Sequence, residues 1–368
     1  MFNKDSMVER LIAYRELRDV KQGDLATAMG FKAHQTLSAI EKFERALKPE
    51  ELLKALEYLK VNFEEFVDPY SLVGEAVYSW RQTNSPQNTL DSFEADTNRV
   101  VALYRDLHKK FSTKKQSVLL PKLPIKKSSS YAEVERIAQS LASELELGDY
   151  PAERLEKQLF EKFNIATLYL DMPSSISGAA TKLNDMFVIL ANRNEVSGRR
   201  NFDIAHEKFH CLTWDAIPPA HIEKAYTSAN RPYEEKLADT FASALLMPKE
   251  KIDKHFSDSS KLIDEESINV LATKFGVSSQ AMKWRLKGLK KIAPKDIQKL
   301  DDSLLINNGN LASSSKPKLF NEQFVEYLYK AIDTGYLSVR KISSTLKMPL
   351  EDLSEIFNDY GKVAPFDL

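Results

Sequence analysis

Apolar residues recur at spacings of three and four along most of the chain, which predicts a mainly helical protein. Outside the first 70 residues, this spacing predicts helices at 90–111, 132–145 and 151–163, and helical structure again within 319–360. Two short apolar runs, 165–170 and 186–191, instead have the length and composition of strands, with Ser177–Thr181 between them. The expected fold class is therefore mainly α with a small β-sheet (α+β).

The first 70 residues predict a small helical domain. Apolar positions at Val8, Leu11, Ile12 and Leu17 mark a first helix. A second helix over 24–30 ends at Gly30, and a third covers 34–41. Two short helices around a glycine-containing turn are typical of a helix-turn-helix.

Composition divides the rest of the chain. Residues 71–130 contain a helical segment followed by clustered lysines, Pro121, Pro124 and three serines, so we expect a helical, basic linker. Its cations are expected to be solvated rather than bound to nucleic acid or an acidic protein. A second folded domain is expected at 131–295. A polar join follows it, and the region 296–368 is a C-terminal helical region that packs on this domain or mediates assembly.

The run Ile204–Leu212 contains a His-Glu-x-x-His pattern. On a helix, His206 and His210 stand one turn apart on one face, so both imidazoles can reach one Zn²⁺. Glu207 then leans toward a water molecule beside the ion and is the expected catalytic base.

A zinc site of this kind needs a third protein ligand. The apolar stripe of residues 232–248 predicts a helix that Pro248 ends. Glu235 lies on its flank and is the expected ligand, although periodicity alone does not exclude Glu234. Asp239, four residues later, is placed to accept the free ring N–H of a ligand histidine. Peptide hydrolysis also needs an oxyanion donor, and His221, Tyr226 and Tyr233 lie between the two helices, with no spacing argument to choose among them.

Net charge and cysteine content limit the expected partners and cellular compartment. The net charge is −1, which gives no general attraction to nucleic acid or membranes. A single cysteine, Cys211, excludes an intramolecular disulfide and favours a reducing cytoplasm. No signal peptide or long apolar run is visible, so secretion and membrane contact are not expected.

The segment Ser197–His210, with Glu235–Ala242 and Leu245–Pro248, resembles the ImmA/IrrE family of zincin-like metallopeptidases. The resemblance covers roughly residues 131–290. It implies a strand-rich lobe before the active-site helix and Glu235 as the third zinc ligand. Phe209 is a departure, because the family commonly has glycine before the second histidine.

Residues 22–66 resemble the XRE family of lambda-repressor-like DNA-binding domains, which can dimerise and place their third helix in the major groove. The residues placed to contact DNA are Gln22, Lys32, His34, Gln35, Thr36, Ser38 and Lys42. Residues 1–70 nevertheless hold eleven Lys and Arg against thirteen Asp and Glu, which is unfavourable for phosphate contact. A protein-docking domain of the same fold is the alternative.

Together these features predict an intracellular zinc endopeptidase that cleaves a specific regulatory protein, such as a repressor, stress regulator or toxin-antitoxin partner. A DNA-binding regulatory domain is attached to it, and a homodimer is compatible with that domain. The alternative is a non-catalytic transcriptional regulator or interaction module with a structural or vestigial metal site.

Overall fold

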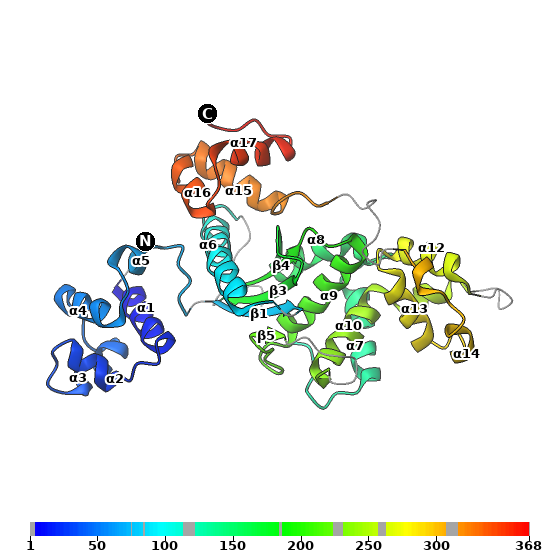
Figure 1. Cartoon of the computed structure of the whole chain (residues 1–368), viewed down its shortest axis with the longest axis horizontal. Helices are drawn as coiled ribbons and strands as arrows, with labels where there is room; N and C mark the ends of the chain where they lie inside the picture. Colours follow the sequence, from blue (N-terminus) through cyan, green and yellow to red (C-terminus); the bar gives the residue numbers. More distant parts are fainter. Residues whose placement is uncertain are drawn as a thin grey trace.

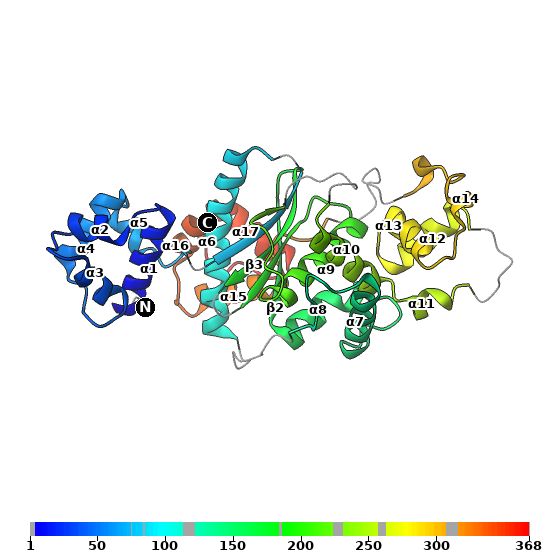
Figure 2. The same ribbon diagram turned by 90° about the horizontal axis from the view of Figure 1, so that it is seen from below.

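The computed structural model describes residues 4–74, 76–83, 85–112, 122–183, 186–223, 231–256, 263–306 and 316–367. The molecule is elongated, with a helical domain at one end and the helices of residues 265–297 at the other (Figures 1 and 2). None of the helices within these ranges is long and apolar enough to cross a membrane.

The N-terminal domain is formed by five helices around their own apolar core. They are α1 (Lys4–Leu17), α2 (Gln22–Ala28), α3 (His34–Glu41), α4 (Pro49–Leu59) and α5 (Phe63–Val67). Leu11, Leu25, Leu37 and Leu56 are buried in this core. Helices α2 and α3 are joined through Gly30, whose φ of 86° suits glycine, as the helix-turn-helix expectation requires.

The central body is built on a five-stranded sheet with the order β2-β4-β3-β1-β5. The strands are β1 (Ala76–Gln82), β2 (Ile165–Leu170), β3 (Ile176–Leu183), β4 (Phe187–Asn192) and β5 (Ile222–Glu223). β2 runs parallel to β4 and β1 parallel to β5, whereas β3 is antiparallel to both of its neighbours. The expected strands at 165–170 and 186–191 are therefore present, and the segment between them forms a third strand.

Helices cover both faces of this sheet, because successive residues of its strands are buried on opposite sides. In β4, Phe187 and Ile189 pack with α9 (Ser197–Thr213), while Val188 and Leu190 pack with α6 (Gln87–Phe111). Figure 2 shows the resulting three layers. The remaining helices are α7 (Tyr131–Glu144), α8 (Ala152–Phe163), α10 (Tyr233–Leu246), α11 (Lys249–Asp253), α12 (Glu265–Phe275), α13 (Ser279–Gly288) and α14 (Pro294–Ile297), followed by a short 3₁₀ helix at Asp302–Leu304.

The prediction of a linker at 71–130 is wrong for much of this range. Residues 76–82 form β1, which pairs along its whole length with β3, and α6 is packed against the sheet. The helix expected at 90–111 corresponds to α6, whereas the composition of this range gave no indication of β1. Residues 113–121 of the expected linker lie outside the described residues.

The C-terminal region consists of α15 (Glu322–Asp333), α16 (Val339–Leu346) and α17 (Leu350–Asp359). It packs on α6, where Phe324 of α15 contacts Tyr104 edge to face at a ring-centroid distance of 5.4 Å. This region therefore covers the side of α6 that the sheet does not.

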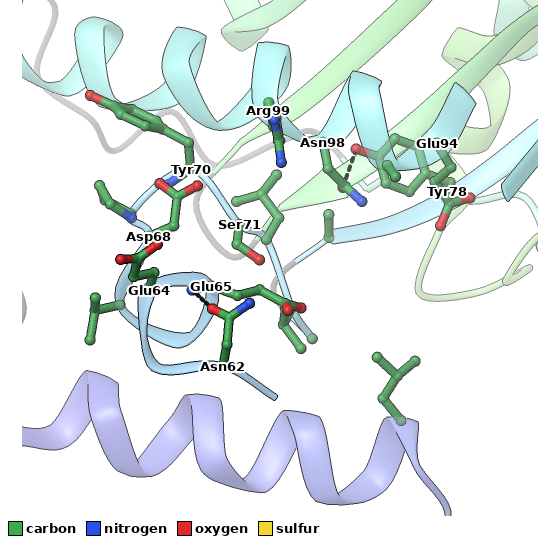
Figure 3. Close-up of a pocket in the computed structure, with 18 of the residues that line it drawn as sticks. Asn62, Glu64, Glu65, Asp68, Tyr70, Ser71, Tyr78, Glu94, Asn98 and Arg99 are labelled. Carbon is green, nitrogen blue, oxygen red and sulfur yellow. Dashed lines mark hydrogen bonds between the residues drawn. The ribbon is translucent and has the colours of Figure 1, made fainter. Parts of the chain in front are cut away.

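A cavity of about 950 Å³ lies where the N-terminal domain meets the central body (Figure 3). Its polar lining includes Glu65 and Asp68 from the N-terminal side, and Tyr78, Glu94 and Arg99 from β1 and α6. Because α6 is on the opposite face of the sheet from α9, this large cavity is separate from the histidine motif.

Candidate metal centre

Helix α9 fixes the two motif histidines through its buried stripe. Ala205, Phe209 and Leu212 are buried in the core against the sheet and α10. His206 and His210 lie one turn apart and are themselves almost fully buried, with 0% and 3% exposure. Burial on all sides restricts their rotamers and holds both rings in place.

Helix α10 supplies the third side chain. Leu237, Ala238 and Phe241 are completely buried and pack this helix on α9 and α7. This packing turns Glu235 inward, with 6% of its surface exposed. Asp239, one turn further along, lies on the same side of the helix.

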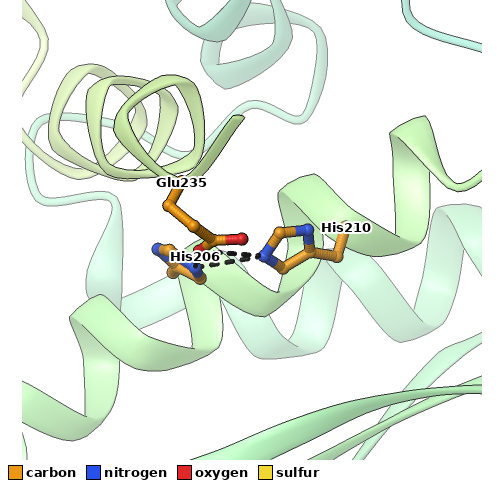
Figure 4. A group of neighbouring side chains, drawn as sticks. All are labelled: His206, His210 and Glu235. Carbon is orange, nitrogen blue, oxygen red and sulfur yellow. Dashed lines mark hydrogen bonds and ion pairs between the residues drawn. The ribbon is translucent and has the colours of Figure 1, made fainter. Parts of the chain in front are cut away.

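Three ligand atoms converge between these helices (Figure 4). The Nε2 atoms of His206 and His210 are 3.1 Å apart. The Oε2 atom of Glu235 lies 3.1 Å from the first of them and 3.7 Å from the second. Among the described residues, Glu235 belongs to this group and Glu234 does not.

These separations fit a tetrahedral metal site. Ligands at about 2.0–2.1 Å from a zinc ion are about 3.3 Å from one another in tetrahedral geometry, which is close to the three distances observed. Two imidazoles and one carboxylate are also the donor set of a common class of catalytic zinc sites. The residues present therefore fit the ion.

Hydrogen bonds around the cluster orient its ligands. His206 uses Nδ1 to donate to Asp239 Oδ1 at 3.0 Å, and Nη2 of Arg231 donates to the same oxygen at 3.2 Å. Asp239 therefore fixes the ring so that Nε2 faces Glu235. This is the arrangement expected for a carboxylate that supports a ligand histidine.

The carboxylates favour positive charge at this position. Burial lowers the pKa of His206 and Arg81 lowers it further, but hydrogen bonds to Asp239 and Glu235 outweigh both and raise it to about 10. Burial lowers the pKa of His210 despite the hydrogen bond to Glu235, and the neighbouring His206 adds to this effect. A site that stabilises one positive charge between two imidazoles is electrostatically suited to a cation.

Two arginines near the cluster were not expected from the sequence. Arg81, on β1, forms an ion pair with Asp203 of α9 at 3.0 Å, one turn before His206. Arg231 precedes α10 and contacts Asp239. Tyr78 and Trp80 alternate with polar residues, which is typical of a strand. This pattern was overlooked because the segment was interpreted as part of a linker.

The remaining residues of the motif are buried. Glu207 is 2% exposed and Lys208 is fully buried. The ring of Phe209 packs between Phe241, at a centroid distance of 5.7 Å, and His210, at 5.6 Å. The bulky residue therefore fills the space between α9 and α10, behind the metal cluster. Cys211 is a free, buried thiol and is not part of the cluster.

The three candidate oxyanion donors have different positions. The hydroxyl group of Tyr233 donates to the backbone carbonyl oxygen of Ser129 at 2.9 Å. The imidazole of His221 is held by Glu94 of α6, with Nε2 and Oε2 3.3 Å apart, and its Nδ1 lies 3.2 Å from the carbonyl oxygen of Tyr78. These contacts direct the His221 ring toward the face of the sheet opposite α9. Tyr226 lies outside the described residues.

The residues expected to contact DNA lie on or beside α2 and α3. Lys32, His34, Gln35 and Lys42 are exposed, and Thr36 and Ser38 are partly exposed on α3. The side-chain amide of Gln22 instead donates to Glu41 at 2.7 Å, so it braces α2 against α3.

Two family models match separate parts of the chain. The IrrE N-terminal-like domain model, of the Peptidase_M78 family, matches residues 160–287, and a helix-turn-helix model matches residues 11–66. A comparison with curated proteins finds no match. The two matches cover the metal cluster and the N-terminal helices, respectively. The chain therefore combines a region similar to helix-turn-helix domains with a region similar to the IrrE N-terminal-like domain.

Proposed function

We propose that the protein is a zinc-dependent endopeptidase that cleaves a specific regulatory protein and is brought to DNA by its N-terminal domain. The observation that carries this proposal is the convergence of His206, His210 and Glu235, whose ligand atoms lie within 4.8 Å of one another. The family match supports peptidase chemistry at this site.

The mechanism follows from the positions of the chain's own residues. A zinc ion bound here would polarise the scissile carbonyl and make a water molecule more acidic. Glu207, adjacent to His206 on α9, accepts the proton from the attacking water and delivers it to the leaving amine. Asp239 keeps His206 in the orientation that ligation requires.

The donor to the developing oxyanion is assigned to His221 or Tyr226, both in the segment between the two metal-binding helices. His221 must leave Glu94 to reach the substrate, because its ring is held on the α6 side. We expect His221→Ala or Tyr226→Phe to lower kcat by about 100-fold with zinc content unchanged. An unchanged kcat would remove that residue from the mechanism.

Metal analysis and a matched base variant test the enzyme proposal. We expect the wild-type protein to contain one zinc ion per chain and His206→Ala to contain little. Glu207→Gln should keep the zinc but lose hydrolysis, because only the proton acceptor is removed. A wild-type protein without zinc contradicts the proposal, and zinc without hydrolysis of any substrate supports a non-catalytic regulator instead.

The substrate is sought by comparing protein fragments in cells that carry wild type or Glu207→Gln. A regulator whose fragments appear only with the wild type is the expected substrate. If no fragment depends on Glu207, limited proteolysis of a regulator is excluded under those conditions.

DNA contact is proposed for α3, supported by its exposed polar side chains and the helix-turn-helix match. Such a role places the protein in the cytoplasm, in agreement with its single cysteine. In a mobility-shift assay with the full chain and its own promoter region, Gln35→Ala and Lys32→Ala should weaken binding. The control Lys295→Ala, on α14 at the far end of the molecule, should not. Binding that is insensitive to both substitutions would favour docking to a protein.

A further inference from the structure

A second cavity, of about 610 Å³, adjoins the metal cluster. Asp239 forms part of its wall, and the same carboxylate accepts the hydrogen bond from His206. The side chain of Asp239 is 32% exposed, whereas that of His206 is fully buried. The surroundings of the metal cluster therefore open toward solvent at this cavity.

The arginines of the cavity wall are matched by carboxylates. Three guanidinium groups line the cavity, and each has a partner of its own. The pairs are Arg81 with Asp203 at 3.0 Å, Arg231 with Asp239 at 3.2 Å, and Arg285 with Glu135 at 2.8 Å. A charged side chain of a substrate would therefore lose hydration here without gaining a new ion pair, which costs free energy.

Aromatic side chains from three helices form the apolar part of the wall. Tyr131 lies at the start of α7, Phe202 on α9 and Trp284 on α13. The surface of Tyr131 is 44% exposed and that of Trp284 is 50% exposed. These rings therefore offer apolar surface to a group that enters the cavity.

Exposed apolar side chains gather at this cavity. Among the described residues of 122–306, the large apolar side chains that are exposed are Tyr131, Tyr233, Val270, Trp284 and Leu304. Two of them line the cavity, and Tyr233 packs against Tyr131 at a ring-centroid distance of 5.3 Å. The hydroxyl group of Tyr233 donates to the carbonyl oxygen of Ser129 at 2.9 Å, which holds this pair in place. Exposed apolar surface with polar groups around it is typical of a binding site.

The cavity also has room for a bulky side chain. Its volume falls within the range of about 300–1,000 Å³ that is common for ligand pockets. Gly288 of α13 lines it, and a Cβ at this position would meet no atom within 4 Å. The space between the rings is therefore not filled by the glycine side of the wall.

We infer that this cavity binds an aromatic side chain of the protein substrate close to the scissile bond. Trp284 and Tyr131 are the specificity-determining residues, because contact between aromatic rings stabilises a complex by more than the apolar area that it buries. The three ion pairs hold the polar part of the wall in place. This assignment rests on the proposed peptidase function and specifies its substrate class.

A binding experiment tests the assignment independently of hydrolysis. The full-length Glu207→Gln protein, loaded with zinc, is incubated with a pooled library of blocked octapeptides, and the retained peptides are sequenced. At one position, we expect Phe, Tyr and Trp to exceed Ala about tenfold and to exceed Leu about threefold. The preference should persist as salt is added, because it depends on apolar contact and not on charge.

Matched variants identify the residues responsible. Trp284→Ala removes the exposed indole and should reduce the aromatic preference about threefold, whereas Trp284→Phe keeps a ring and should retain it. Val270→Ala removes an exposed apolar side chain of α12 that does not line the cavity, and the preference should persist. No retained peptides, Leu enriched as strongly as Phe, or an unchanged preference in Trp284→Ala would each overturn the assignment.

Gly288→Leu tests the same cavity by filling it. Because a Cβ at Gly288 meets no neighbouring atom, we expect this variant to keep the thermal stability of the parent protein. Its added side chain should occupy the space for the ligand and weaken binding of the best retained peptide about tenfold. Unchanged peptide affinity in Gly288→Leu would overturn the assignment.

The fluorescence of Trp284 gives a second readout of peptide binding. The best retained peptide should change the fluorescence of the Glu207→Gln protein. Adding Trp284→Phe should abolish this signal although the peptide still binds, because the other tryptophans, Trp80 and Trp214, are buried. A signal that survives this substitution would place the peptide elsewhere and overturn the assignment.

The assignment and the proposed enzyme function can fail separately. Peptide hydrolysis by the wild type without an aromatic preference would overturn only the assignment of the cavity. An aromatic preference without any hydrolysis by the wild type would contradict only the proposed enzyme function.

Discussion

Phe209 shows how one side chain can support the metal cluster without contacting the ion. Its ring is completely buried between Phe241 and His210. Phe209→Ala should lower the free energy of unfolding by about 3–5 kcal/mol, because it leaves a cavity between α9 and α10. Urea unfolding in the presence of a chelator measures this cost without a metal contribution. Phe209→Leu is the control and should cost less, and equal stability of all three proteins would show that the ring is not a packing element.

Lys208 is a buried amine in the same helix turn. It is fully buried, and within the described part of the chain its Nζ has no hydrogen-bond partner, although it lies 5.0 Å from the centre of the Phe163 ring. Burial lowers the pKa of Lys208 well below its usual value. Lys208→Met keeps the length of the side chain and should stabilise the protein by about 1–3 kcal/mol in urea unfolding at pH 7. Lys162→Met, which removes an exposed lysine of α8, should change little; a destabilised Lys208→Met would indicate a structural use of the amine.

Glu156 predicts a dependence of stability on pH. Burial raises the pKa of this carboxyl, although Tyr169, whose hydroxyl donates to it at 2.5 Å, and Arg200 oppose the shift. Because the pKa is raised, the protonated carboxyl is favoured in the folded state. Its contribution to folding stability is complete below the unfolded pKa of about 4.3 and is lost as the pH rises through the folded pKa. Glu156→Gln should therefore match the wild type near pH 4 and be more stable at pH 7. Thermal unfolding at both pH values measures this, and a variant that is less stable at pH 7 would contradict the assigned cause.

The candidate metal cluster could be predicted from the sequence, because the residues that each helix contributes are set by local helical spacing. His206 and His210 are four apart, as are Glu235 and Asp239, and this spacing survives any arrangement of the two helices. Arg81 reaches the same place from a strand more than 120 residues away along the chain. No local periodicity carries that information.

At the scale of whole elements, β3 escaped prediction for a different reason. Its residues 176–183 include Gly178 and two alanines, which have low strand propensity, and nearly all are buried on both faces. A Cβ at Gly178 would lie 2.6 Å from the carbonyl oxygen of Leu190, so the close approach of β4 requires glycine there. Sheet pairing, and not local preference, makes this segment a strand.

Gly198 tests how closely α9 must approach α13. A Cβ at this position would lie 2.5 Å from the carbonyl carbon of Val277 and 2.6 Å from the nitrogen of Ser278, in the turn between α12 and α13. Gly198→Ala should push this turn away and lower the thermal stability.

The control for Gly198 is Gly288, near the end of α13, where a Cβ would meet no atom within 4 Å. Gly288→Ala should leave the stability unchanged or raise it by up to about 1 kcal/mol, because alanine favours a helix. If the two variants have the same stability, the close contact at Gly198 is not required.

The whole molecule depends on a strand and a helix that precede the region matched by the peptidase family. β1 pairs with β3, and α6 buries Val101, Leu103 and Tyr104 on the face of the sheet opposite α9. Tyr70 and Leu72, just before β1, belong to the same apolar core. The N-terminal domain has a separate core, against which Val73 also packs, so the division between the two folding units falls within residues 68–74.

A pair of truncated chains tests this division. The fragment 69–368 keeps β1, α6 and the residues that anchor them, so we expect it to fold, bind zinc and resist protease. The fragment 131–368 follows the boundary suggested by composition, but it exposes one apolar face of the sheet and should aggregate or lose zinc. Circular dichroism, size-exclusion chromatography and zinc content distinguish the two. A folded, zinc-binding 131–368 fragment would show that β1 and α6 are dispensable. Because Arg81 is absent from this fragment, its ion pair with Asp203 of α9 would then not be needed for zinc binding.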